Sequence, residues 1–177
     1  MIWLLVVSGF FGALVLGLLI LGLLQPARHS VTRSITLKEK PEIVFALIDN
    51  VDQLPSWSSM VVKVEHLPDR NGRPTTRQIL TFGMAFIATT IERRPPSRLV
   101  GSLERERGPL MGTWTYDITP DGDGCRVAIT EEGELKSPFM RAFARLRGLD
   151  ASILQQLNDL ARKFGTPAVN SHGSSAA

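Results

Sequence analysis

The chain has 177 residues, of which 44% are apolar and 21% are charged, and its formal net charge is +3. A length of this order allows about one folded domain. Its single cysteine, Cys125, excludes an internal disulfide and a cysteine-based zinc site. One long uncharged apolar run at the start of the chain argues against both a polytopic transporter and a purely soluble protein.

Residues 2–24 form this apolar run, which contains four glycines and one serine but no charged residue. As a helix the run would be about 34 Å long, which is enough to cross the hydrocarbon core of a bilayer. No Lys or Arg precedes it, and Gln25-Pro26-Ala27 is a poor cleavage site, so an uncleaved anchor is favoured over a signal peptide. We therefore predict a single-pass membrane protein with a transmembrane anchor over residues 1–25.

Positive charge follows the apolar run, where Arg28 and Arg33 come first, and none precedes it. The positive-inside rule then places the C-terminal domain in the cytoplasm, with these residues facing anionic membrane lipid. Ser8, Gly12 and Gly17 have helical spacing and would let two such helices pack as a homodimer. Alternatively, these small residues reflect only the ordinary abundance of glycine in membrane helices and indicate no dimer. Nucleic acid is not an expected partner, because 17 acidic residues nearly balance 20 basic ones.

Beyond the apolar run, the pattern changes to short elements of a folded domain. Pro26 ends the first helix, and residues 26–30 are expected to be a short linker. Apolar and polar residues alternate over residues 31–37, which predicts a strand. Pro41 then opens a short helix, since proline suits the first helical turn. A second short helix or turn is expected over residues 49–57.

Six strand-like segments follow at short spacing, which predicts an antiparallel meander. Asn71-Gly72 and the segment 120–124 are strong turn signals between them. The six expected strands cover residues 60–67, 75–82, 84–93, 98–107, 110–119 and 126–135.

Residues 137–164 are expected to form a long C-terminal helix. Ser137 suits the N-cap and Pro138 the first helical position. Gly148 interrupts the apolar periodicity and predicts a kink or break near residues 147–150. Residues 166–177 are rich in Ser, Gly and Ala, and we expect a disordered tail there.

The order of these elements and a set of local motifs resemble one known superfamily. The motifs are Lys40-Pro41-Glu42-Ile43-Val44-Phe45, Asn50 through Pro55-Ser56-Trp57, Gly112-Thr113-Trp114-Thr115-Tyr116 and Gly122-Asp123-Gly124-Cys125-Arg126-Val127. Residues 31–164 resemble the START-related (SRPBCC) superfamily, and within it the polyketide cyclase/dehydrase-like branch. The resemblance implies an α+β helix-grip fold over residues 31–165: a curved antiparallel sheet of about seven strands around the long C-terminal helix. It also implies an apolar cavity between them.

Eight residues are candidates for binding a ligand in that cavity. Trp114 and Tyr116 share one face of their strand, and Glu131 shares a face with Val127 and Ile129. If both faces point inward, Glu131 places a carboxylate against the cavity as a possible general acid or base. Alternatively, it lies at the rim or pairs with an arginine such as Arg105 or Arg77. The aromatic candidates, each of which could equally be plain core, are Trp57, Phe82, Phe86, Trp114, Tyr116, Phe139 and Phe143.

No motif in the chain assigns a reaction. The three histidines, His29, His66 and His172, share no ligand spacing, so neither a metal nor another cofactor is expected. The leading prediction is a membrane-anchored domain that binds a hydrophobic small molecule, such as a lipid, a quinone or a polyketide-like compound. The alternatives are a cyclase- or dehydratase-like enzyme that uses polar residues of the same cavity, and a membrane-tethered interaction scaffold.

Overall fold

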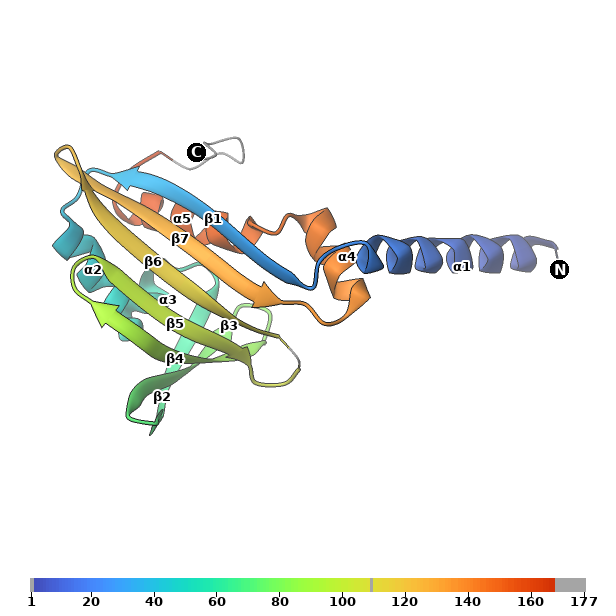
Figure 1. The fold of residues 1–177 in the computed structure, drawn as a ribbon, viewed down its shortest axis with the longest axis horizontal. Coiled ribbons are helices and arrows are strands. Elements are labelled where there is room, and N and C mark those ends of the chain that lie inside the picture. The colour runs from blue at the N-terminus through green and yellow to red at the C-terminus, as the bar shows by residue number, and fades with distance from the viewer. Residues whose placement is uncertain (1, 109, 168–177) are drawn as a thin grey trace.

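A computed structural model describes residues 2–108 and 110–167 of the chain. The described residues form one antiparallel sheet of seven strands in the order β1-β7-β6-β5-β4-β3-β2, together with helices near both ends of the chain and between β1 and β2 (Figure 1). The strands are β1 (Arg28–Leu37), β2 (Val61–Arg70), β3 (Arg73–Leu80), β4 (Ala85–Arg94), β5 (Arg98–Arg105), β6 (Met111–Asp121) and β7 (Gly124–Glu134). The helices are α1 (Ile2–Leu23), α2 (Pro41–Asp49), η1 (Val51–Gln53), α3 (Leu54–Trp57), α4 (Pro138–Arg147) and α5 (Ala151–Lys163).

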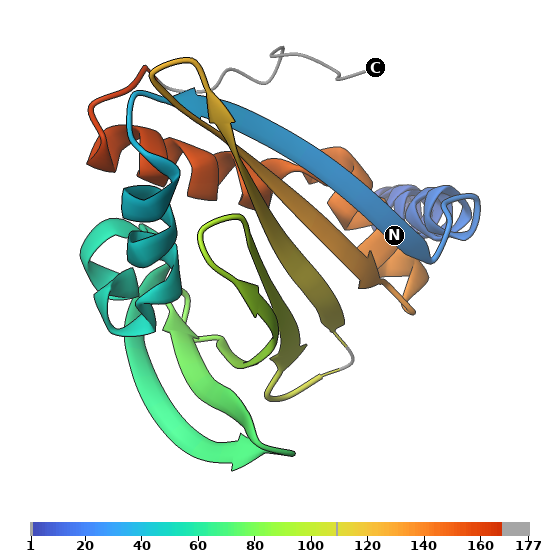
Figure 2. The same ribbon diagram turned by 60° about the vertical axis from the view of Figure 1, so that its left-hand side comes forward.

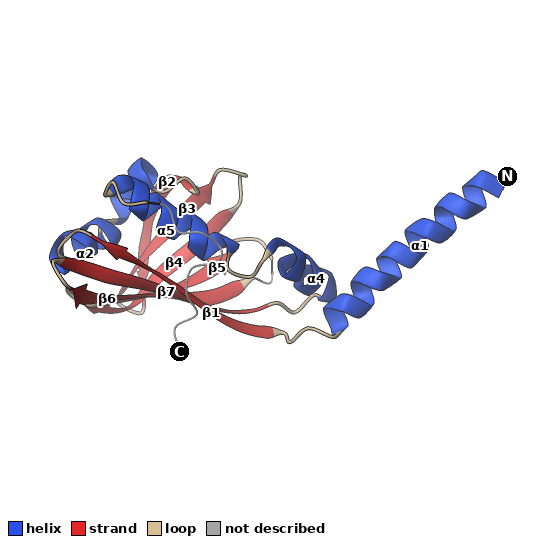
Figure 3. Cartoon of the chain, turned by 90° about the horizontal axis from the view of Figure 1, so that it is seen from above, coloured by secondary structure: helices blue, strands red, loops and turns tan. Residues whose placement is uncertain are grey.

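The sheet is strongly curved, and α5 lies across its concave face near β1 and β7 (Figures 2 and 3). The segment α2–η1–α3 closes one end of that face, where it connects β1 to β2. The predicted meander and the hairpin turn at residues 120–124 are confirmed, because each consecutive pair from β2 to β7 is antiparallel. The architecture fits the predicted helix-grip fold.

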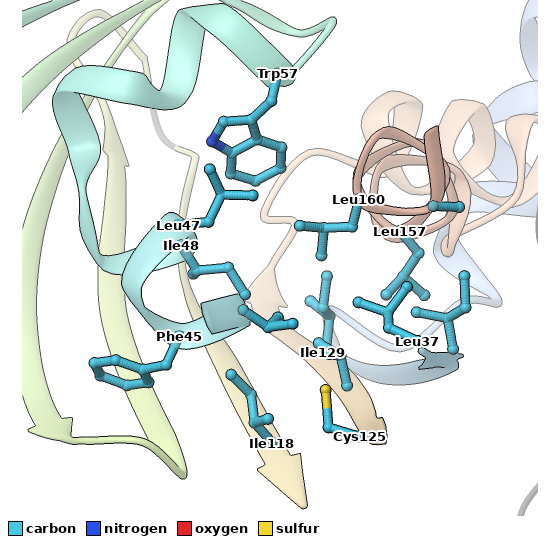
Figure 4. Close-up of a cluster of buried hydrophobic side chains, with 14 of the residues drawn as sticks. Leu37, Phe45, Leu47, Ile48, Trp57, Ile118, Cys125, Ile129, Leu157 and Leu160 are labelled. Carbon is cyan, nitrogen blue, oxygen red and sulfur yellow. The ribbon is translucent and has the colours of Figure 1, made fainter. Parts of the chain in front are cut away.

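The main core lies between α2, α5 and the β1–β7–β6 part of the sheet. Leu157 and Leu160 of α5 face Leu37 and Ile129 of the sheet, and all four side chains are fully buried (Figure 4). Apolar residues at helical spacing on α5 therefore cover apolar residues at period two on the strands, as the sequence pattern requires. The other half of the sheet, from β5 to β2, curves away from α5.

The predicted break in the C-terminal helix is confirmed at Gly148. This residue has a φ of +93°, a conformation that favours glycine, and it separates α4 from α5. Of these two helices, α5 packs on the sheet, whereas α4 turns away and packs on α1. At this crossing a side chain on Gly22 would overlap the Pro138 carbonyl, and Arg141 Nη1 donates to the Gln25 carbonyl at 2.9 Å.

The predicted membrane location is wrong. Among the residues that the structure describes, none of the helices has both the length and the apolar character that crossing a bilayer demands. The prediction of a single-pass protein with a cytoplasmic domain is corrected by this finding.

One boundary differs from the sequence prediction, and the predicted tail lies largely outside the described residues. The expected linker over residues 26–30 overlaps β1, which begins at Arg28 because residues 28–30 pair with residues 134–132 of β7. Of the expected disordered tail, residues 168–177 lie outside the described part of the chain.

Candidate functional site

A cavity of about 550 Å³ lies between the curved sheet, α5 and the α2–α3 segment. It forms because α5 covers the β1–β7 side of the sheet, while the strands from β5 to β2 curve away from the helix. Two small residues on its wall, Ala88 and Gly101, leave further space. Most of the wall is apolar and includes Leu54, Phe86, Leu99, Leu103, Leu110 and Trp114.

The structure brings five of the eight predicted ligand-binding residues to the cavity wall: Trp57, Phe86, Trp114, Tyr116 and Glu131. Their strands explain this placement. Trp114 of β6 pairs with Glu131 of β7, and Tyr116 follows at period two on the same face. The rings of Trp114 and Tyr116 pack against each other, with centroids 6.3 Å apart.

The other three predicted residues lie outside the cavity. Phe82 belongs to the turn between β3 and β4 and is 80% exposed. Phe139 and Phe143 are exposed on α4, which the break at Gly148 directs away from the sheet. Helical periodicity placed them correctly on an apolar helix face, but that face does not cover the concave sheet.

One polar cluster lies within the apolar wall, around the hydroxyl of Tyr116. Gln156 Nε2 donates to this hydroxyl at 3.4 Å, and Ser58 Oγ donates to Gln156 Oε1 at 3.2 Å. Gln156 is buried on α5 among the core leucines. The indole Nε1 of Trp57 is buried and has no hydrogen-bond partner in the described part of the chain. The cluster can therefore offer hydrogen bonds to a ligand oxygen.

Tyr116 is the only tyrosine in the chain, so phenolate absorbance reports its hydroxyl alone. Burial raises its pKa well above the usual 10.0, and the hydrogen bond from Gln156 opposes this only in part. We expect no phenolate absorbance from the folded protein just above pH 10.0. The unfolded chain loses this proton from pH 10.0 upward while the folded chain retains it, so the free energy of unfolding is expected to fall as pH rises.

An absorbance titration followed together with circular dichroism checks this expectation. The phenolate band is expected to appear as the dichroism signal of the fold is lost. Ionisation at an ordinary tyrosine pKa, with the fold intact, would show that the hydroxyl is not buried in the cavity wall.

Glu131 points inward, but its partners differ from the predicted arginines. Its Oε2 accepts a hydrogen bond from Ser152 Oγ at 2.7 Å, and its Oε1 lies 3.7 Å from His29 Nε2. Arg77 instead binds Glu65 and Glu106. All three members of the cluster His29, Glu131 and Ser152 lie on the cavity wall.

Sequence reasoning missed Gln156, His29 and Ser152. Gln156 had a detectable signal, because it interrupts the apolar stripe that Ile153, Leu157 and Leu160 form on one helix face. His29 had a weaker one, because it lies two residues before Val31 and shares its strand face. Ser152 had no signal of its own, since nothing local indicates that Glu131 will face it.

Two side-chain contacts connect the α2–η1 segment to strands β4 and β2 beside the cavity. Arg93 of β4 binds Asp49 through two hydrogen bonds of 2.8 and 2.6 Å, which raise the pKa of its guanidinium. His66 Nε2 of β2 lies 2.7 Å from Asp52 Oδ1.

In the described residues, no cluster of three or more His, Cys, Asp or Glu side chains is arranged to hold a metal ion.

Comparison with known proteins gives a family and a fold. A family described as polyketide cyclase/dehydrase and lipid transport matches residues 28–165. No curated protein matches the chain. A START superfamily protein from Mycobacterium smegmatis has a TM-score of 0.63 at 15% identity, over 77% of this chain and 97% of that one.

Two aromatase/cyclase structures are also similar. An aromatase/cyclase from a Streptomyces species has a TM-score of 0.66 at 11% identity, over 78% of this chain and 94% of that one. A di-domain aromatase/cyclase from the steffimycin biosynthetic pathway has a TM-score of 0.64 at 14% identity, over 78% of this chain. The match spans 51% of that longer protein. At these identities the structural matches show the fold alone.

Proposed function

The chain belongs to the polyketide cyclase/dehydrase and lipid transport family, and from this premise we propose that its internal cavity binds a hydrophobic small molecule. A lipid, a quinone or a polyketide-like compound has the required character: a mostly apolar body with a few hydrogen-bonding oxygens. The observation that carries the proposal is the cavity of about 550 Å³ with its mostly apolar wall. Its volume lies within the range of about 300–1,000 Å³ that is typical of small-molecule sites.

The polar groups around the Tyr116 hydroxyl support binding rather than a reaction. The side chains of Ser58, Gln156 and Tyr116 already bind one another. With its raised pKa, Tyr116 carries a neutral hydroxyl that can orient a ligand oxygen but is a poor base near neutral pH. An open cavity also argues against a scaffold whose interior is filled by its own side chains.

Native mass spectrometry of the purified full-length chain tests the proposal. We expect a population with an added mass of a few hundred daltons, which is released when the protein is denatured. The neutral fluorescent probe N-phenylnaphthylamine is expected to bind the ligand-free population saturably, with one probe per chain. A bare chain mass in every preparation, together with no saturable binding of the probe, would contradict the proposal.

A further inference from the structure

Polar side chains also line the cavity on β3, one of the strands that curve away from α5. The β3 residues on the wall follow one another at period two: Pro74, Thr76, Gln78 and Leu80. The residues between them are absent from the wall, so the wall here consists of side chains that point inward from one face of the strand. Arg77 shows where the other face points, because it binds two glutamates outside the cavity.

Thr76 and Gln78 form what we call the distal subsite. Neither side chain makes a hydrogen bond within the described part of the chain. Their polar atoms nevertheless keep accessible surface, unlike the covered Nδ1 of His29 and Nε1 of Trp57. Because both side chains point inward, this surface is open to a molecule in the cavity.

The neighbouring strands explain why these two groups have no partner. Across the β3–β4 pair, Thr76 faces Ala88 and Gln78 faces Phe86. A methyl group and a phenyl ring have no atom that pairs with a hydroxyl or an amide. On the other side of Thr76, the β2–β3 register places His66, whose Nε2 already lies 2.7 Å from Asp52 Oδ1. The fold therefore leaves two polar groups unpaired on a mostly apolar wall.

The distal subsite restricts which part of a ligand can lie against it. An apolar part would displace the water that otherwise solvates Thr76 and Gln78 and would leave their polar groups unpaired, which costs free energy. A ligand group that forms hydrogen bonds avoids this cost. Neither side chain carries a charge that could pair with an ionic group, so an uncharged hydroxyl, carbonyl or amide suits the subsite.

The distal subsite is separate from the cluster around the Tyr116 hydroxyl. In the sheet, β4 and β5 lie between β3 and β6, so the two polar regions are on strands about 14 Å apart along the curved surface. The β5 residues on the wall have no polar side chain: Leu99, Val100, Gly101 and Leu103. An apolar stretch of wall therefore divides the two polar regions.

We propose that the ligand carries two separate uncharged polar groups on an apolar body, one bound by the Tyr116 cluster and the other by Thr76 and Gln78. The Gln78 amide both donates and accepts, and Thr76 adds a hydroxyl, so the distal subsite can bind either a hydroxyl or a carbonyl. A lipid with a single polar end satisfies only one of the two regions. This inference rests on the proposed function, because it names the ligand class that the same cavity takes.

Linear diols of eight, ten and twelve carbons test the inference, each compared with the alcohol of the same length, such as decanediol with decanol. Every compound competes with N-phenylnaphthylamine for the full-length chain, which gives the affinity of each diol relative to its alcohol. A second hydroxyl also costs free energy to remove from water. The change in this affinity ratio between variants, rather than the ratio itself, therefore reports the contact with the distal subsite.

Gln78→Leu removes the amide and keeps a side chain of similar size. The domain is expected to stay folded, because the amide has no partner in the described part of the chain. At one or more chain lengths, the diol-to-alcohol ratio is expected to fall about fivefold, in line with the net value of one hydrogen bond. The alcohol loses less, since its one hydroxyl can still bind the Tyr116 cluster. Gln53→Leu is the matched control, because it makes the same substitution on exposed η1 outside the cavity.

Thr76→Val is a second variant of the distal subsite. It removes the hydroxyl while the shape of the side chain is kept, and the diol-to-alcohol ratio is again expected to fall. Thr119→Val is its matched control, because Thr119 is exposed on β6 and lies outside the cavity.

The outcomes separate this inference from the proposed function. If the fluorescent probe binds but the ratios of Gln78→Leu equal those of Gln53→Leu at every chain length, the inference is overturned and the proposed function stands. The same conclusion follows if the alcohols displace the probe and none of the diols does. Should Gln78→Leu fail to fold, Thr76→Val decides, and ratios equal to those of Thr119→Val overturn the inference. If the probe does not bind the unmodified chain, both proposals fall together.

Discussion

Replacing Gly101 with leucine is expected to weaken ligand binding by about tenfold or more, with the domain still folded. Gly101 of β5 lies on the cavity wall and pairs with Trp114 of β6. A Cβ at this position meets only the Thr89 carbonyl oxygen, at an ordinary 3.8 Å, so the backbone can carry a side chain. The leucine would occupy space that the ligand needs, and overpacking of this kind costs about 1–3 kcal/mol.

The fold itself is expected to tolerate this change. Leucine suits a strand better than glycine does, and an apolar side chain that fills a cavity commonly adds about 0.5–2 kcal/mol of stability. Titration with N-phenylnaphthylamine measures the affinity, and urea denaturation measures the stability. Gly17→Leu is the matched control, because it makes the same substitution on α1, where a Cβ meets no atom within 4 Å. Equal affinities of the Gly101→Leu and Gly17→Leu variants would place the probe outside the cavity.

Asp159→Ala is expected to lower the free energy of unfolding by about 3 kcal/mol, through lost hydrogen bonds to a charged group. Asp159 lies on α5 and is only 2% exposed. Its Oδ2 accepts from the Ser59 amide at 2.6 Å and from Ser59 Oγ at 2.9 Å, and its Oδ1 binds Arg162. The carboxylate thereby links α5 to the α3–β2 connection beside the cavity. Alanine would leave the Ser59 amide, the Ser59 hydroxyl and the Arg162 guanidinium without their acceptor.

Urea denaturation measures this loss, and two further variants define its origin. Asp159→Asn keeps an acceptor for Ser59 but removes the charge, so an intermediate loss is expected. Gln155→Ala is the matched control on the same helix, because Gln155 Nε2 also donates to Ser59 Oγ but from the exposed side. We expect Gln155→Ala to lower the free energy of unfolding by well under about 1 kcal/mol, because exposed polar contacts contribute little to stability. A loss for Asp159→Ala no larger than that of the control would mean that the buried carboxylate does not hold α5 in place.

Local patterns in the sequence were sufficient to predict much of this fold. Period two placed Trp114 and Tyr116 on one face, the turn at residues 120–124 defined a hairpin, and Gly148 marked the helix break. These features depend on residues close together in the chain, where spacing and turn chemistry act directly.

The missed residues depend on contacts between distant elements. His29, Glu131 and Ser152 meet only because β1 pairs with β7 in one register and α5 crosses both. The direction of α4 after the break is also a matter of tertiary packing, since helical spacing shows that Phe139 and Phe143 share a face but not what that face covers. The N-terminal apolar run was likewise assigned from composition and length, and the predicted membrane location proved wrong.

The position of a bound ligand tests the central claim most directly, because exposed apolar side chains on α1 and α4 offer another place for an apolar molecule to bind. Nuclear Overhauser effects between decanol and the full-length chain can locate it, and the single tyrosine makes one wall residue unambiguous. We predict contacts from the decanol methylenes to the rings of Tyr116 and Trp114. Contacts confined to Phe10 and Phe11 of α1, or to Phe139 and Phe143 of α4, would contradict a ligand-binding cavity.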